Sequence, residues 1–337
     1  MVFVTGGTGL VGSHLLMRLL QRGLKPRALR RPESDLKKIA DLFELYGPKT
    51  TALFEDIEWV SGDLNDLPSL EIALKGVTEV YHCAALISFN PGDRDALRRV
   101  NHEGTRNIVN LCLNRGIKRL YYCSSIATIG GIKAIKTEED LWDPTDTNVY
   151  ATSKYLAEME VWRGGQEGLE TVIVNPGVIF GPGFWDRGSA KFFTKTAPGL
   201  KYSPPGGTGF IGVMDVVQAF ETLIEKQCFN QRYILVAENL KFGEVLSQIA
   251  GHLQVAPPAR ILKTWQLEWL WRLDWFRSIL SGGPRKLTRD TARSLKSINT
   301  YSSEKIIGHT GFQFEPIGEV LRECSLHFIK WDKGNHS

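Results

Sequence analysis

The chain has 337 residues, of which 42% are hydrophobic and 23% are charged, proportions that are typical of a globular enzyme and exclude a disordered or low-complexity chain. The formal net charge is only +4 and the charges are interspersed, so the composition gives no indication of nucleic acid or an anionic membrane as a partner. No apolar run approaches the roughly 18 residues of a membrane span, and the first residues lack the features of a signal peptide. The five cysteines and seven histidines show no metal-ligand spacing, so we expect reduced thiols, no metal site and a soluble, cytoplasmic protein.

Short runs rich in β-branched and aromatic residues alternate with segments of helical period in the first half of the chain. This alternation predicts βαβ units around a parallel sheet. The first predicted helix, over 10–21, carries a stripe of leucines and ends before Gly23, a residue suited to the left-handed position after a helix. A second helical pattern runs over 95–116. The six expected strands are Val2–Thr5, Arg27–Arg30, Ile57–Val60, Glu79–Cys83, Arg119–Ser124 and Thr171–Asn175.

The residue pattern changes after residue 176, where Gly/Pro-rich loops precede a helical pattern at 243–253 and a tryptophan-rich segment. We therefore predict an α/β protein with a Rossmann-type, doubly wound parallel sheet and a smaller, mixed C-terminal lobe that binds the substrate. The dinucleotide-binding domain is expected to cover residues 1–176, with 210–236 returning to it. The lobe is expected to cover 177–209 and 237–337.

A glycine-rich turn follows the first expected strand and opens the first expected helix. Its three glycines lie three residues apart, a spacing that permits a tight turn and lets the unpaired N–H groups of the helix N-terminus approach a pyrophosphate. Because the turn stands at the first strand-to-helix junction of a βαβ run, it predicts dinucleotide binding. The residues expected at this site are Gly6, Thr8, Gly9, Leu10, Val11 and Gly12.

The end of the second strand indicates which dinucleotide is bound. An acidic residue there would bond the ribose 2′-hydroxyl of NAD, whereas a basic residue would accept the 2′-phosphate of NADP. The strand ends in Arg30 and Arg31 with no carboxylate in the expected place, so NADP is favoured over NAD. After the third strand, Asp63 and Leu64 are placed to contact the adenine, although Gly-Asp is also an ordinary turn pair.

Tyr150 and Lys154 are four residues apart, on one face of a predicted helix. A nearby cation lowers the pKa of a phenol, by roughly two units at 5 Å, and brings it into the range useful for proton transfer. The same spacing recurs at Tyr301 and Lys305, so the spacing alone does not show which tyrosine is catalytic. Only Tyr150 follows a strand that ends in hydroxyl residues, among them Ser125, at the sheet edge where open α/β sheets bind ligands.

Taken together, these motifs resemble an extended short-chain dehydrogenase/reductase, the group that contains sugar-nucleotide epimerases and dihydroflavonol-reductase-like enzymes. The resemblance implies that Tyr150 is the general acid/base and that Lys154 holds the nicotinamide ribose and lowers the pKa of the phenol. It implies that Ser125, five residues before Gly130, orients the substrate oxygen in preference to Ser124. It also implies a homodimer through the helices that contain Asp95 and Tyr150. The remaining residues that it assigns are Asn101 in the proton relay or cofactor pocket, Pro176, Gly177 and Val178 beside the nicotinamide, and Cys83, Ala84 and Ala85 beside the pyrophosphate and ribose.

The reaction is expected to be hydride transfer between the nicotinamide and a carbonyl or secondary alcohol of a small, partly apolar substrate. Dehydratases of the group carry an Asp-Glu pair after the catalytic hydroxyl, where this chain has Ile126 and Ala127. A nucleotide-sugar epimerase is the alternative, with Arg187, Lys191 and Lys195 available for a diphosphate; a non-catalytic NADP-binding regulator is a third reading. The apolar residues expected around the substrate are Ile87, Phe89, Ile126, Ile129, Phe184, Trp185, Phe192, Phe193 and Tyr202.

Four tryptophans crowd the segment 265–275, with apolar residues on more than one helical face. A buried helix of the second lobe is the main expectation. A substrate lid and a membrane-surface or partner contact are the alternatives.

Overall fold

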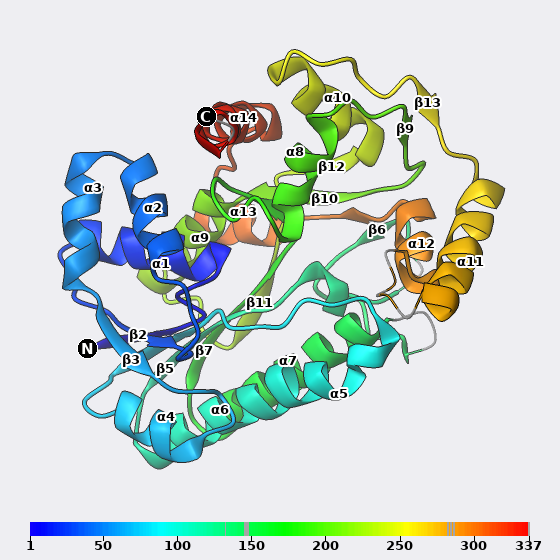
Figure 1. The fold of residues 1–337 in the computed structure, drawn as a ribbon. Helices are drawn as coiled ribbons and strands as arrows, with labels where there is room; N and C mark the ends of the chain where they lie inside the picture. Colours follow the sequence, from blue (N-terminus) through cyan, green and yellow to red (C-terminus); the bar gives the residue numbers. More distant parts are fainter. Residues whose placement is uncertain (132, 145–147, 282, 284, 286, 336–337) are drawn as a thin grey trace.

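The computed structural model describes residues 1–131, 133–144, 148–281, 283, 285 and 287–335. Its centre is a seven-stranded, entirely parallel sheet in the order β11-β7-β5-β4-β1-β2-β3 (Figure 1). The strand order reverses between β1 and β4, which makes this junction the switch point of a doubly wound sheet. The strands are β1 (Val2–Thr5), β2 (Arg27–Arg30), β3 (Glu58–Ser61), β4 (Glu79–His82), β5 (Arg119–Cys123), β7 (Glu170–Pro176) and β11 (Gln231–Leu235).

All six strands expected from the sequence belong to this sheet, and the predicted fold class is confirmed. The bounds of β1 and β2 are as expected, and the ends of the other four strands differ from the expected positions by at most one residue. The seventh strand, β11, pairs with β7 at the edge of the sheet.

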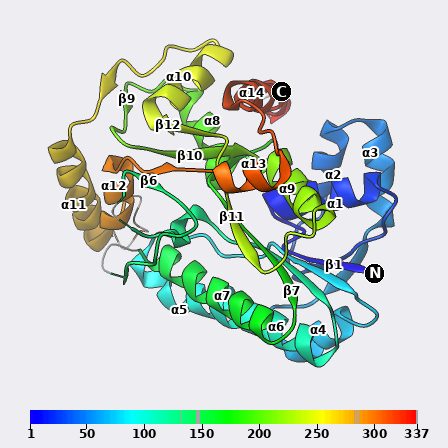
Figure 2. The ribbon, with the colours of Figure 1, turned by 180° about the vertical axis from the view of Figure 1, so that it is seen from behind.

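Helices cover both faces of the large sheet (Figures 1 and 2). Successive side chains of a strand point to opposite faces, so in β1 Val4 packs under α1 and α9 while Phe3 packs under α4 and α6. These helices are α1 (Leu10–Gln21), α2 (Lys37–Leu45), α3 (Pro48–Leu53), α9 (Val213–Glu225) and α13 (Glu304–Thr310) around the first face, and α4 (Leu67–Ala73), α5 (Arg94–Leu97), α6 (Gly104–Asn114) and α7 (Val149–Gln166) around the second.

Helix α1 ends where the sequence predicts. Gly23 adopts φ +78°, the N–H of Gly23 donates to the carbonyl of Leu20, and the N–H of Leu24 donates to the carbonyl of Leu19. This pair of bonds is the Schellman arrangement, which satisfies carbonyls at the helix end.

The second lobe is built on a three-stranded mixed sheet, β12-β10-β8, with a core rich in phenylalanine. Helices α8, α10 and α14 pack on it. Its strands are β8 (Val178–Phe180), β10 (Gly207–Gly212) and β12 (Glu238–Lys241), and its helices are α8 (Lys191–Thr196), α10 (Phe242–His252) and α14 (Ile317–Asn335).

Two further strand pairs and a helix pair complete the fold. They are β9 (Tyr202–Ser203) with β13 (Arg260–Ile261), β6 (Ile135–Lys136) with β14 (Thr300–Tyr301), and α11 (Thr264–Ser281) with α12 (Arg289–Lys296). In the part of the chain that the structure describes, no helix is both long enough and apolar enough to cross a membrane.

Two expectations about burial are wrong. Helix α11, expected to be a buried helix of the lobe, lies at the periphery with most of its apolar residues exposed (Figure 1). Several residues expected around the substrate are core residues instead, because sequence alone does not show which apolar side chains the second lobe buries. They are Trp185 and Phe193 in the core of the second lobe, and Ile126 and Ile129 beside Ile234 and Val236.

Candidate active site

The glycine turn after β1 is packed so closely that side chains would not fit. Gly6 has φ +74°, and a Cβ there would lie 2.6 Å from the backbone nitrogen of Ala84; a Cβ on Gly12 would lie 2.2 Å from the carbonyl oxygen of Gly6. The turn therefore lies directly against the segment after β4, where Cys83 and Ala84 are partly buried and Ala85 is exposed. The sequence placed these two segments on one site, and the structure brings them together.

The N-terminus of α1 is open toward this turn. Its N-cap is Gly9, and no side chain among the described residues caps the N–H groups of its first turn, which belong to Leu10, Val11 and Gly12. Arg187 reaches the same place from the second lobe, since its guanidinium donates to the carbonyl of Thr8 at 3.0 Å. Free N–H groups, the helix dipole and a guanidinium are the features that bind a pyrophosphate.

The two arginines after β2 lie in different surroundings. Arg30 is partly buried, and its Nε has no hydrogen-bond partner among the described residues. Arg31 is exposed and forms an ion pair with Glu33 at 3.2 Å. In the neighbouring turn, Asp63 accepts the backbone N–H of Asn65, and Leu64 is buried in the core. Of the two arginines, Arg30 is therefore the one with a buried Nε that lacks a hydrogen-bond partner among the described residues.

Tyr150 and Ser125 come together at the carboxyl end of β5. Helix α7 begins at Val149 because Asn148 caps it, accepting the N–H of Ala151 at 2.8 Å, and this start sets Tyr150 in the first turn. Tyr150 is 9% exposed. Burial raises the pKa of Tyr150 to about 12, against which the neighbouring Ser125 hydroxyl acts to lower the pKa. The phenol is therefore protonated at neutral pH.

Lys154 follows one turn later and is almost completely buried. Its ammonium donates to the hydroxyl of Tyr122 at 2.6 Å and to the carbonyl of Cys123 at 2.9 Å. Burial lowers the pKa of Lys154 to about 8. The expectation that Lys154 lowers the pKa of Tyr150 is not met, because the ammonium is directed to Tyr122 and Cys123 and the pKa of Tyr150 is raised by burial instead.

A line of buried polar groups continues from Lys154 to the glycine turn. His82 contacts Thr105 at 2.9 Å through Nε2 and Thr5 at 2.6 Å through Nδ1, and its ring stacks on Tyr122. Burial lowers the pKa of His82 to about 3. His82 is thus a neutral residue of the interior that ties β4 to β1 and to the helices on the second face of the sheet.

Asn101 is buried, and both polar atoms of its side chain form hydrogen bonds. Its Oδ1 accepts the N–H of Leu86 at 2.7 Å, and its Nδ2 donates to the carbonyl of Leu86 and to the hydroxyl of Ser153. It lies in the π-helical turn Arg98–Glu103 between α5 and α6. The side chain therefore fastens the segment after β4 to α7, and among the described residues it forms no side-chain hydrogen bond with Tyr150 or Ser125.

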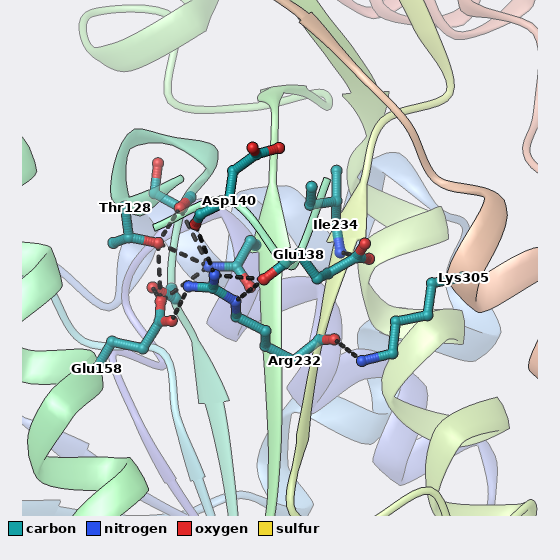
Figure 3. Close-up of polar contacts among 10 residues, drawn as sticks. Thr128, Glu138, Asp140, Glu158, Arg232, Ile234 and Lys305 are labelled. Carbon is teal, nitrogen blue, oxygen red and sulfur yellow. Dashed lines mark hydrogen bonds and ion pairs between the residues drawn. The ribbon is translucent and has the colours of Figure 1, made fainter. Parts of the chain in front are cut away.

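A buried polar cluster behind Ser125 was not foreseen from the sequence (Figure 3). Glu158 accepts bonds from Ser124 at 2.5 Å, from Thr128 at 2.8 Å and from Asn175 at 2.8 Å, and it forms an ion pair with Arg232 at 3.1 Å. Glu158 lies four residues after Lys154, so their shared helix face was a signal that could have pointed to it.

Arg232 extends the same cluster outward to the segment before α7. Its guanidinium donates to the carbonyls of Glu138 and Asp140, while the carboxylate of Glu138 accepts the N–H of Ile234 (Figure 3). The cluster thus joins β11, α7 and the loop that carries Ser125.

The junction between β7 and β8 closes the site from the second lobe. Pro176 is buried, Gly177 and Val178 are partly buried, and a Cβ on Gly177 would lie 2.4 Å from the carbonyl oxygen of Gly209. Asn175, next to Pro176, has an Oδ1 that is buried and has no partner among the described residues.

The second Tyr-x-x-x-Lys match is not part of the site. Tyr301 lies in strand β14 rather than on a helix, and Lys305 donates to the carbonyl of Arg232 on the far side of the cluster.

Comparison with known proteins finds one family model and several relatives that match most of the chain. The model of the NAD dependent epimerase/dehydratase family matches residues 2–234. The chain is 30% identical to a putative dihydroflavonol 4-reductase of Synechocystis sp., over 97% of this chain and 94% of that protein. It is 32% identical to sterol demethylase protein B of Methylococcus capsulatus, over 77% and 78%. The crystal structure of gox2253 matches with a TM-score of 0.80 and 29% identity, over 98% of both chains.

Proposed function

Because the chain belongs to the NAD-dependent epimerase/dehydratase family, we propose that it is an oxidoreductase that transfers a hydride between NADP(H) and a carbonyl or secondary alcohol. The substrate is small and partly apolar, and Tyr150 is the general acid/base.

The pairing of Tyr150 with Ser125 carries this proposal. The two hydroxyls lie at the carboxyl end of β5, two strands from the glycine turn after β1. With a pKa of about 12, Tyr150 is a phenol at neutral pH and is suited to donate a proton to a carbonyl oxygen as it is reduced. Ser125 donates to the same oxygen and orients it. In the opposite direction Tyr150 accepts the proton as a phenolate, so we expect alcohol oxidation to become faster as the pH rises toward the pKa of Tyr150.

The residues present fit a dinucleotide. The uncapped N-terminus of α1 and Arg187 receive the pyrophosphate, and the unpartnered Nε of Arg30 is available to a 2′-phosphate. The two described bonds of Lys154 use two of the three ammonium N–H groups, which leaves one for a ribose hydroxyl. When bound, the nicotinamide supplies or accepts the hydride.

An apolar substrate is supported by the surroundings of Tyr150. The ring of Phe89 packs edge to face on Tyr150, with the ring centres 5.5 Å apart, and Phe89 is 39% exposed. Relatives named for a dihydroflavonol and for a sterol agree with a polycyclic or aromatic substrate.

The epimerase alternative is less well supported. Of the three basic residues available for a sugar diphosphate, Arg187 is turned toward the glycine turn, and Lys191 and Lys195 are exposed on α8. A non-catalytic regulator is disfavoured because Ser125, Tyr150 and Lys154 are all in place.

The test is the absorbance of NADPH during incubation with a panel of aromatic and polycyclic ketones. Oxidation of NADPH in proportion to the ketone supports the reductase. Conversion of a nucleotide sugar to its epimer without net change in the cofactor would support the epimerase instead, and the absence of both reactions with tight NADPH binding would support the regulator.

A further inference from the structure

Helix α11 presents an apolar face to the surface rather than to the core. Five of its residues recur at intervals of three or four and therefore share one side of the helix. They are 59% to 78% exposed, whereas Leu267 alone is buried within this fully described helix. We name this set the apolar face of α11; it consists of Trp265, Trp269, Leu273, Phe276 and Leu280.

The acidic residues of α11 are turned the other way. Glu268 accepts bonds from Lys296 of α12 and from the indole of Trp271, and Asp274 accepts the backbone N–H of Leu287 at 2.9 Å. In an ordinary surface helix the apolar side chains face the protein and the charges face water. In α11, by contrast, most of the apolar side chains are exposed to water.

Basic residues border the apolar face on both edges. At 100° per residue, Arg272 and Arg277 lie on opposite sides of it, and they are 53% and 41% exposed. Each forms an ion pair with an acid of the same helix, Arg272 with Glu268 and Arg277 with Asp274. The segment that leads into the helix adds Arg260 and Lys263, both exposed.

We propose that α11 docks on the surface of a lipid bilayer that contains anionic headgroups. The apolar face enters the boundary between headgroups and acyl chains, where tryptophan is favoured, and the basic edges meet the headgroup phosphates. A second copy of the chain is a less favourable occupant, because a two-fold contact between identical faces would bring their basic edges together. The helix lies on the surface and does not span the bilayer.

The docking helix is connected to the candidate active site. Helix α12 packs against α11, and its N-cap residue Thr288 donates to the carbonyl of Phe89 at 3.1 Å. Phe89 packs in turn on Tyr150. Docking would therefore hold the approach to Tyr150 next to the bilayer, a consequence that rests on the proposed function and suits an apolar substrate dissolved in lipid.

The experiment is co-sedimentation of the full chain with phosphatidylcholine vesicles, with and without phosphatidylglycerol, in the absence of substrate and cofactor. The matched variants are Leu273→Ser with Leu280→Ser on the apolar face, and Ile72→Ser with Leu326→Ser, two residues that are 70% and 52% exposed on other helices. We expect the wild type to bind phosphatidylglycerol vesicles, the first pair to lose binding at least about tenfold, and the second pair to bind as the wild type does.

The basic edges are tested separately. Arg272→Gln with Arg277→Gln should weaken binding to phosphatidylglycerol vesicles and remove much of its salt dependence. The proposal is overturned if the wild type does not bind, if both serine pairs bind equally well, or if the wild type is a dimer in solution that Leu273→Ser with Leu280→Ser dissociates. Because no reaction is measured, failure of the proposed function would leave these outcomes unaffected.

Discussion

Lys154 is a cation held in the interior by three contacts with two residues, Tyr122 and Cys123. Its ammonium bonds the hydroxyl of Tyr122 and the carbonyl of Cys123 and lies 4.3 Å from the centre of the Tyr122 ring. These contacts offset only part of the cost of desolvation, since burial still lowers the pKa of Lys154 from 10.5 to about 8. Lys154 is thus charged at neutral pH, and its buried charge lowers the stability of the folded state.

The pH dependence of stability should report this cost. Because the pKa of Lys154 is lower in the folded state, the unfolded chain binds more protons between pH 8 and 10.5, and stability rises with pH across that window. Below pH 8 the full penalty is present, about 3 kcal/mol. We therefore expect wild type to gain about that much relative to Lys154→Met between pH 7.5 and 10.5, measured by urea unfolding. Parallel pH profiles for the two proteins would refute the buried charge.

The choice of cofactor should depend on one arginine more than on its neighbour. Arg30 is partly buried with an unpartnered Nε, whereas Arg31 is exposed and paired with Glu33. Arg30→Ala should weaken NADPH binding about ten- to a hundredfold with little effect on NADH. Arg31→Ala is the matched control and should change the ratio of the two dissociation constants much less. Equal effects of the two substitutions, or wild-type preference for NADH, would contradict the assignment.

At the scale of elements, the sequence predicted what depends on local pattern. Six of the seven strands of the large sheet and both ends of α1 follow from β-branched runs, leucine spacing and Gly23, because these features act within a few residues. The exposed face of α11, the core positions of Trp185 and Phe193 and the contacts of Glu158 depend on which distant segments meet. Periodicity sets Glu158 on the same helix face as Lys154, but the distant residues that these side chains meet are determined by the assembled fold.

The Glu158 cluster sets how α7, β11 and the Ser125 loop meet. Glu158 is completely buried and Arg232 nearly so, with side-chain exposures of 0% and 14%. Glu158→Gln removes the charge and turns a donor toward Asn175 or Arg232, so the free energy of unfolding should fall by about 3 kcal/mol. We expect kcat to fall with it while the cofactor dissociation constant changes little, because the cluster contacts Ser124 and Thr128 and no residue of the glycine turn.

A conservative variant separates geometry from charge. Arg232→Lys keeps the cation but cannot reach Glu158 and the carbonyls of Glu138 and Asp140 together. In Arg232→Lys both the free energy of unfolding and kcat should fall, though less than in Glu158→Gln. Wild-type stability in both variants, measured by urea unfolding, would show that the cluster does not position the loop.

At the scale of the whole molecule, the candidate site draws residues from both lobes along the carboxyl ends of β1, β4 and β5. The first lobe contributes the glycine turn, Ser125, Tyr150 and Lys154, and the second contributes Arg187, which reaches the carbonyl of Thr8. Separation of the lobes would therefore expose the turn, and cofactor binding should hold them together and raise the unfolding temperature.

The central claim is that Tyr150 transfers a proton to the substrate while other residues hold the cofactor. The most direct measurement compares wild type with Tyr150→Phe in NADPH-dependent reduction of the best ketone from the panel, together with the NADPH dissociation constant of each protein. The account predicts that turnover falls by at least about a hundredfold while the dissociation constant stays within about threefold. Turnover of Tyr150→Phe within tenfold of the wild type would contradict it.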